Sequence, residues 1–295
     1  PFGAYVTTNG GTSFTRYGSG NGLPTDDCRA IAFFDGATTA SHFCVATGFG
    51  IAYTTNGGTT FTIRNSASSP AIANDCRDVD YHDGTASGAR FAVATGSGVY
   101  HTSNGGGAFT QRTAAGATTI PSNDVRSLRY SEVDTTGATW LVGAWFTGPA
   151  PGGAGLTTND GGAFTRFLPN TVVHGVDYHK GISGSWAVAH STGLAVTTNN
   201  GGGFTTYTTT QGLPSNDVRS VAYAGGTSTA STWLVGTDEG VVRTTNGGTG
   251  FTTFRKGTLS SNLHAAVTTT LPAGTAIRWQ VCDASWVLLP DAVLP

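Results

Sequence analysis

One octapeptide recurs six times along the chain, and its spacing constrains the fold more than any other feature. The copies read TTNGGTSF, TTNGGTTF, TSNGGGAF, TTNDGGAF, TTNNGGGF and TTNGGTGF. Their central asparagines lie 40 to 55 residues apart, at Asn9, Asn56, Asn104, Asn159, Asn199 and Asn246. A period of this length is typical of proteins built from repeats of one supersecondary unit.

Each octapeptide predicts a hairpin turn, because it separates two short runs with strand character, such as GVVRTTN and FTTF in the last copy. Asparagine tolerates left-handed backbone and bonds the amides of its own turn, and the glycine two residues later supplies a positive φ. We therefore expect six structural turns at the asparagines, each with its closing phenylalanine packed inward. Repeated calcium or sugar sites are the alternative interpretation.

Two more strands precede each turn, clearest in DVRSVAY (217–223) and TWLVGT (232–237). Four strands in every 40 to 50 residues are typical of propeller blades. The sequence therefore predicts an all-β fold, a six-bladed β-propeller of four-stranded antiparallel blades.

The repeat phase also predicts how the propeller closes. With the strands of a repeat named A to D, complete blades are expected at 27–64, 75–112, 124–167, 171–207 and 217–255. Residues 1–20 carry only strands C and D, and residues 263–295 carry strands A (263–270) and B (277–282). We expect these fragments to pair as a sixth, closing blade, which removes an open sheet edge and makes 1–295 one domain.

Composition excludes several classes of partner. Charged residues make up 11% of the chain, the formal net charge is −2 and there are two lysines, so no basic field exists to attract nucleic acid. No apolar run reaches the length of a membrane span. Methionine is absent even at residue 1, which indicates a processed or trimmed chain. We expect an extracellular, periplasmic or cell-surface location.

The four cysteines are Cys28, Cys44, Cys76 and Cys282. They lack CxxC or Cys/His ligand spacing, so neither a metal nor another cofactor is expected, while disulfides and buried free thiols both remain open. Cys28 and Cys76 stand at equivalent starts of adjacent inner strands and are expected to be close without necessarily being bonded. Antiparallel register should place Cys44 opposite a residue near Ala32.

The octapeptide resembles the Asp-box, or bacterial neuraminidase repeat, with Asn for the usual Asp and Phe for the usual Trp. The other half of the repeat, GLPSNDVRSVAY with TWLVGTDEGV, is similar to repeats of the periplasmic sensor propellers of two-component regulators. Together the two resemblances cover nearly the whole chain and imply a propeller. They imply no single function, because Asp-box propellers include sialidases, xyloglucan hydrolases, sortilin-type receptors and photosystem assembly factors. In those families the Asp-box is a peripheral turn away from the ligand site.

Enzyme activity is the alternative to a binding function. A sialidase-like site would need an FRIP-like segment, which is absent, and the two glutamates, Glu132 and Glu239, are expected on opposite faces, too far apart for a glycosidase pair. Aspartates recur at one face and keep a carbohydrate-active enzyme open as the second hypothesis. Their recurrence suits a turn or an ion pair better than a catalytic pair, so no catalytic residue is assigned. These aspartates are Asp26, Asp27, Asp75, Asp124 and Asp217.

A basic or titratable residue also recurs at the start of strand A. Because strand A is innermost, these residues should surround one mouth of the central channel. They can form an ion-pair girdle between blades, or they can bind an anion, a carboxylated sugar or an acidic peptide end. The six members are Arg29, Arg77, Arg126, His174, Arg219 and His264.

One insertion, AWFTGPAPGGAG at 144–155, breaks the repeat between strands B and C of the third blade. It shares a face with the basic residues, and Trp145 and Phe146 can stack on a sugar or anchor a partner, or fold back and be hidden. We therefore expect a binding or scaffold module that recognises a glycan or protein partner on the face of the B–C and D–A loops or serves as a component of a larger assembly.

Overall fold

The computed structural model describes residues 3–34, 42–82, 90–115, 119–131, 133–145, 152–227 and 230–255. Its regular elements are strands, apart from the short 3-10 helices η1 (Ser19–Asn21) and η2 (Thr209–Gln211). The strands form six antiparallel sheets, of which five have four strands and one has two. This confirms the predicted all-β fold. Among the described residues, no helix is both long and apolar enough to cross a bilayer.

Each sheet is a meander whose strands follow one another in chain order. The two-stranded sheet consists of β1 (Ala4–Val6) and β2 (Thr15–Tyr17). The first four-stranded sheet contains β3 (Cys28–Phe33), β4 (Phe43–Thr47), β5 (Gly50–Thr54) and β6 (Thr62–Arg64). The second contains β7 (Cys76–Tyr81), β8 (Phe91–Thr95), β9 (Gly98–Thr102) and β10 (Thr110–Arg112). The third contains β11 (Val125–Tyr130), β12 (Trp140–Ala144), β13 (Gly153–Thr157) and β14 (Thr165–Phe167). The fourth contains β15 (Val173–Tyr178), β16 (Trp186–His190), β17 (Gly193–Thr197) and β18 (Thr205–Tyr207). The last contains β19 (Val218–Thr227), β20 (Ala230–Thr237), β21 (Gly240–Thr244) and β22 (Thr252–Arg255).

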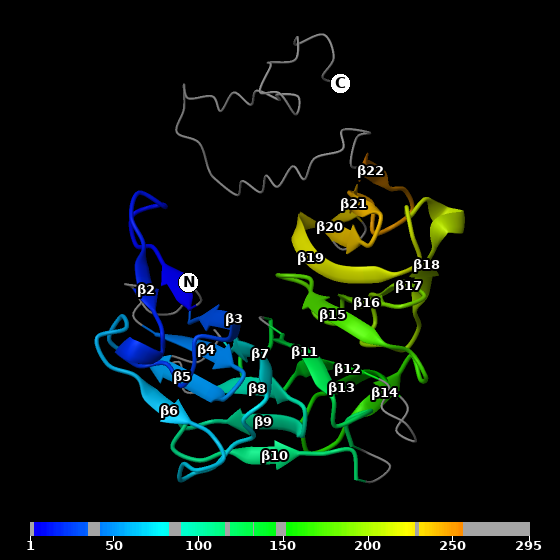
Figure 1. Ribbon diagram of the computed structural model, residues 1–295. Coiled ribbons are helices and arrows are strands. Elements are labelled where there is room, and N and C mark those ends of the chain that lie inside the picture. The colour runs from blue at the N-terminus through cyan, green and yellow to red at the C-terminus, as the bar shows by residue number, and fades with distance from the viewer. Residues whose placement is uncertain are drawn as a thin grey trace.

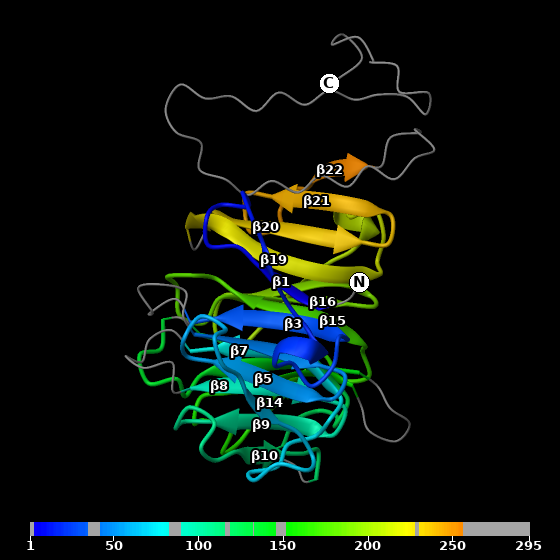
Figure 2. The ribbon, with the colours of Figure 1, turned by 60° about the vertical axis from the view of Figure 1, so that its left-hand side comes forward.

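The sheets are arranged around a common centre in chain order (Figure 1). The first strands of neighbouring four-stranded sheets, β3, β7, β11, β15 and β19, contact one another and form the inner wall. The fourth strands lie at the outside. In the side view, the sheet β19–β22 lies at one end of the stack of strands (Figure 2).

The hydrophobic core lies in layers between successive sheets, so the second strands of the first four four-stranded sheets are buried on both faces. In β4, Phe43 and Val45 pack toward the preceding sheet, whereas Cys44 and Ala46 pack toward the following one. All five residues of β4, β8, β12 and β16 are buried. These strands therefore read as continuous apolar runs rather than alternating ones.

A repeated aromatic pair joins the first two strands of each four-stranded sheet. In the third sheet Tyr130 lies opposite Trp140, and Phe164, which closes the octapeptide, packs edge-on against the same indole at 5.1 Å. Phe61, Phe109 and Phe204 make the equivalent contacts in their own sheets. Phe14 differs, with 59% of its surface exposed, and its sheet has two described strands rather than four.

The six octapeptide turns share one hydrogen-bond pattern. In the second copy, the Thr54 hydroxyl accepts from the Gly58 amide at 3.0 Å, and the Asn56 side-chain oxygen accepts from the Thr60 amide at 3.0 Å. The same two bonds recur in the other five turns. Gly58 has φ of 84°, and a Cβ there would also collide with the Tyr17 ring of the preceding sheet. The turn thus needs glycine for its backbone and for its packing.

The register of the first four-stranded sheet places Cys44 opposite Ala32, as predicted. Cys28, Cys44 and Cys76 are free thiols, and Cys282 lies outside the described residues. Burial raises the pKa of Cys76 to about 12, so this thiol is protonated at neutral pH. The predicted strands at 263–270 and 277–282 also lie outside the described residues, and the sixth, closing blade stays a prediction.

Candidate functional site

The basic residues predicted at the start of strand A gather around one cavity of about 530 Å³. Five of the six members line it, and so does Trp145 from the insertion. His264 and Phe146 lie outside the described residues. The lining residues are Arg29, Asp75, Arg77, Arg126, Trp145, His174 and Arg219.

A β-bulge presents each of these basic side chains to the cavity. In β7 the register shifts between Cys76 and Asp78, so Arg77 has no partner residue across the strand pair. The same shift leaves Arg29, Arg126, His174 and Arg219 as the extra residues of their strands. Because a bulge turns its extra residue out of the regular pleat, the repeated backbone directs five side chains toward the same mouth.

A repeated backbone hydrogen bond fixes the residue two positions before each bulge. The first residue after the second strand donates its amide to that carbonyl. The donor and acceptor pairs are Gly48 to Asp27, Gly96 to Asp75, Trp145 to Asp124, Ser191 to Val172 and Asp238 to Asp217. Trp145 therefore occupies the position of Gly48 and Gly96, and Val172 occupies the position of an aspartate.

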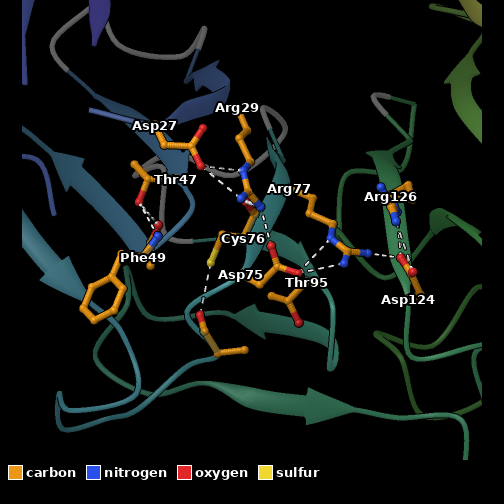
Figure 3. A network of polar contacts seen from close by, with 12 residues as sticks. Asp27, Arg29, Thr47, Phe49, Asp75, Cys76, Arg77, Thr95, Asp124 and Arg126 are labelled. Carbon is orange, nitrogen blue, oxygen red and sulfur yellow. Dashed lines mark hydrogen bonds and ion pairs between the residues drawn. The ribbon is translucent and has the colours of Figure 1, made fainter. Parts of the chain in front are cut away.

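Aspartates and arginines alternate across the first three four-stranded sheets (Figure 3). Arg29 binds Asp27 of its own sheet at 3.0 Å and Asp75 of the next sheet. Arg77 binds Asp75 at 2.7 Å and Asp124 of the following sheet. We call the series Asp27, Arg29, Asp75, Arg77, Asp124 and Arg126 the ion-pair chain. It links three blades at their inner ends.

The ion-pair chain stops at Val172, which offers no carboxylate to Arg126. Arg126 binds Asp124 through Nε at 2.7 Å and Nη2 at 3.2 Å, and its guanidinium lies 4.0 Å from the centre of the Trp145 ring. That indole and the His174 ring are nearly perpendicular, with ring centres 5.6 Å apart. Trp145 is thus folded against the protein, and one face of its ring is covered by Arg126.

The second group of charges begins after the interruption. His174 Nε2 lies 3.3 Å from Asp217 Oδ1, and Arg219 pairs with the other oxygen of the same carboxylate. Burial lowers the pKa of His174, and the opposing effect of Asp217 does not overcome it. Most His174 side chains are therefore neutral at pH 7.

Asp75, in the middle of the ion-pair chain, is suited to holding arginines rather than to donating a proton. Burial alone would raise the pKa of Asp75, but hydrogen bonds from Arg29 and Arg77 lower it below its usual value. A general acid at neutral pH needs the opposite shift. Each of the four arginines lies within ion-pair distance of an aspartate of its own sheet, while Arg29 and Arg77 also pair with an aspartate of the next sheet. The same guanidinium groups line the open cavity.

A second charged cluster, which the sequence reasoning missed, lies further along the inner strands. Asp78 accepts from the Leu128 amide at 3.0 Å and from Arg129 at 3.2 Å, and Asp80 accepts from the Tyr130 amide at 2.8 Å. These amides belong to the inner edge of the next sheet, where no strand pairs with them. The cluster therefore satisfies edge amides across blade boundaries.

Arg129 is shared between sheets, because it also lies 3.8 Å from Asp177 of β15. Burial raises the pKa of Asp78 and of Asp177 despite the nearby Arg129. The signal in the sequence was the acidic residues at alternate positions of DVDY in 78–81, which period-two patterning directs to one face. Among the described residues, no group of three or more His, Cys, Asp or Glu side chains is placed to hold a metal ion.

Neither the protein-family models nor the curated proteins contain a match to this sequence. Solved structures do match. The GH74 xyloglucanase from Xanthomonas campestris is 14% identical with a TM-score of 0.64, and the alignment covers 85% of this chain and 42% of that one. An extracellular domain assigned to a hybrid two-component system of B. thetaiotaomicron is 18% identical with a TM-score of 0.60, covering 81% and 31%.

PorZ, a surface component of the type-IX secretion system of Porphyromonas gingivalis, is 10% identical with a TM-score of 0.56, covering 77% of this chain and 28% of that one. This chain spans less than half the length of each of these three proteins. At these identities the likeness concerns the fold. The chain is an all-β propeller of four-stranded antiparallel blades.

Proposed function

We propose that this propeller is a binding module that recognises a glycan or a protein partner at the cavity around Arg126. The observation that carries the proposal is the repeated bulge, which directs four arginines and a histidine into one open cavity. Guanidinium groups bind carboxylates and other oxyanions through charge-assisted hydrogen bonds.

Two of the arginines have donors to spare. Among the described residues, Arg126 contacts one carboxylate and Arg219 contacts one, whereas Arg29 and Arg77 each contact two. The Arg219 side chain is also 55% exposed. A ligand that enters the cavity therefore meets its free donors on the side of Arg126 and Arg219.

We also propose that the six octapeptides are structural turns of the Asp-box type, with no part in ligand binding. Their threonine and asparagine oxygens accept hydrogen bonds from their own backbone, so these side chains have an internal role. We place the protein outside the cytoplasm, at a cell surface or in a periplasm, where the extracellular sensor domain and the secretion-system component that share its fold also act. It can act there alone or within a larger assembly.

A glycan array and a panel of acidic peptides test the proposal. Arg126→Ala combined with Arg219→Ala should lower binding of any ligand found on the array by at least about tenfold, since each lost charge-assisted bond contributes on the order of 1.5–3 kcal/mol. Arg243→Ala is the matched control, because Arg243 is an exposed arginine of β21 that does not line the cavity. Lower thermal stability with unchanged binding would retire the cavity as the ligand site.

A hydrolysis screen on the same polysaccharides separates binding from catalysis. We expect no turnover. If the wild type hydrolyses a polysaccharide and Asp27→Asn or Asp217→Asn loses this activity while retaining the fold, the protein is a carbohydrate-active enzyme and the proposed binding function is wrong.

A further inference from the structure

The interruption of the ion-pair chain leaves two basic side chains next to each other. Arg29 and Arg77 each bind an aspartate of the following sheet, and the aspartate that would serve Arg126 in the same way is replaced by Val172. The next polar side chain along that strand is His174, whose ring contacts the same indole of Trp145 as the Arg126 guanidinium does. No carboxylate of the described residues stands between the two.

Arg126 is held ready for an additional acceptor. Its Nε and Nη2 atoms are used by Asp124, while Nη1 has no hydrogen-bond partner among the described residues. The stack on Trp145 fixes the plane of the guanidinium group. Because the group is already oriented, binding an acceptor at Nη1 requires little further ordering.

Trp145 is a second residue that departs from the repeat pattern, at the same boundary between the third and fourth four-stranded sheets. The equivalent residues of the first two sheets are Gly48 and Gly96, where a Cβ would collide with Asp27 and Asp75 respectively. The indole nitrogen of Trp145 is buried and has no hydrogen-bond partner among the described residues. Two changes from the repeat pattern therefore meet beside Arg126, and together they leave donors without acceptors.

We propose that the carboxylate of an acidic sugar binds at this interruption and supplies, between Arg126 and His174, the acceptor that an aspartate supplies to Arg29 and Arg77. This inference rests on the proposed function and names the ligand class of its cavity. A sugar is favoured over a peptide because six of the seven lining residues are charged or titratable and only Trp145 is apolar. The hydroxyls of a sugar acid can use such donors and acceptors, whereas apolar peptide side chains find little surface to contact.

His174 should take up a proton when the carboxylate binds. The charged and titratable groups that face it are Asp217, Arg219, Arg126 and His190, and burial holds His190 neutral with a pKa of about 4. In the free protein burial and the two arginines lower the pKa of His174, and a bound carboxylate raises it. Binding should therefore tighten as the pH falls from 7.5 to 5.5, where a sugar carboxylate is still ionised.

The test introduces the missing carboxylate by substitution at Val172. Calorimetric titrations with D-glucuronate, D-glucose and an acetylated peptide with a free C-terminal carboxylate are made on the wild type, Val172→Asp and Val172→Asn at pH 5.5 and 7.5. We expect glucuronate to bind the wild type, more tightly at pH 5.5, and glucose not to bind. Val172→Asp should weaken glucuronate binding at least about tenfold, because its own carboxylate occupies Arg126. The neutral Asn variant should stay within about threefold of the wild type.

Thermal denaturation of both variants checks that the fold is retained. Glucuronate binding that is equal in the wild type and Val172→Asp overturns the location, and binding of the peptide alone overturns the sugar as ligand class. If the array identifies a neutral glycan whose binding depends on Arg126 and Arg219 but not on Val172, the inference fails while the proposed function stands.

Discussion

Replacing Asp160 by asparagine should lower the stability of the propeller by about 1–2 kcal/mol at pH 7. Asp160 is the acidic residue of the fourth octapeptide, and its carboxylate accepts from Arg90 of the preceding sheet at 2.8 Å and lies 3.5 Å from His101. Its backbone is left-handed, with φ of 57°. Asn200 occupies the same turn position with φ of 56°, so asparagine should fit without backbone strain.

The magnitude follows from the acidity of this carboxyl group. Burial alone would raise the pKa of Asp160, but the contacts from His101 and Arg90 hold it at about 2, against 3.8 for an ordinary aspartate. One pKa unit corresponds to 1.36 kcal/mol, so the upper limit is about 2.4 kcal/mol. The side chain is one-third exposed, and solvent screening reduces this value to about 1–2 kcal/mol.

The sign of the pH dependence is fixed, because the folded-state pKa is the lower one. The stabilisation is fully present well above pH 3.8 and is lost as the pH falls toward 2. Urea unfolding followed by tryptophan fluorescence at pH 7, 4 and 3 should show a difference between wild type and Asp160→Asn that falls to about half by pH 3. Asn200→Asp is the matched control and should not stabilise. Equal midpoints at pH 7, or a difference that persists unchanged at pH 3, would refute the reasoning.

Three further substitutions test the fold and its inner wall. Asp78→Ala should cost about 3 kcal/mol in urea unfolding, because it leaves the Leu128 edge amide without its acceptor and removes the nearer of the two carboxylates that Arg129 contacts. Asn104→Ala should cost about 1 kcal/mol, because the turn loses the acceptor of a backbone amide. Leu234→Asp should cost more than about 2 kcal/mol although Leu234 is 41% exposed, because the predicted closing blade should cover it as the fourth blade covers the equivalent Leu141.

Matched controls make these results interpretable. Ser220→Ala changes the residue that corresponds to Asp78 in the last sheet and should be nearly neutral, since Ser220 is exposed. Asn9→Ala repeats the turn substitution in the exposed two-stranded sheet and should cost less than Asn104→Ala. If Leu234→Asp is tolerated as well as Ile63→Asp, on an exposed part of an outer strand, closure of the ring by a sixth blade is wrong.

The sequence alone predicted the features that depend on short stretches of chain. The octapeptide fixes a turn because Thr54, Asn56 and Gly58 interact within a few residues of one another. Strand alternation and hairpin register follow from the same local rules, which is why Cys44 could be placed opposite Ala32. The gathering of the basic residues around one mouth also followed, because a repeat places equivalent residues at equivalent positions around the centre.

The choice of partners within the cavity depended on tertiary structure. Arg77 pairs with Asp124 across a blade boundary, and Trp145 covers Arg126. Both contacts join side chains that the packing of the sheets brings together, so their spacing in the chain does not predict them. The valine at 172 was visible in the sequence, but its meaning was not, because only the folded protein shows that Arg29 and Arg77 reach forward to an aspartate of the next sheet. Repetition determined where the charged groups lie, and the packing between blades decided which of them retain unused donors.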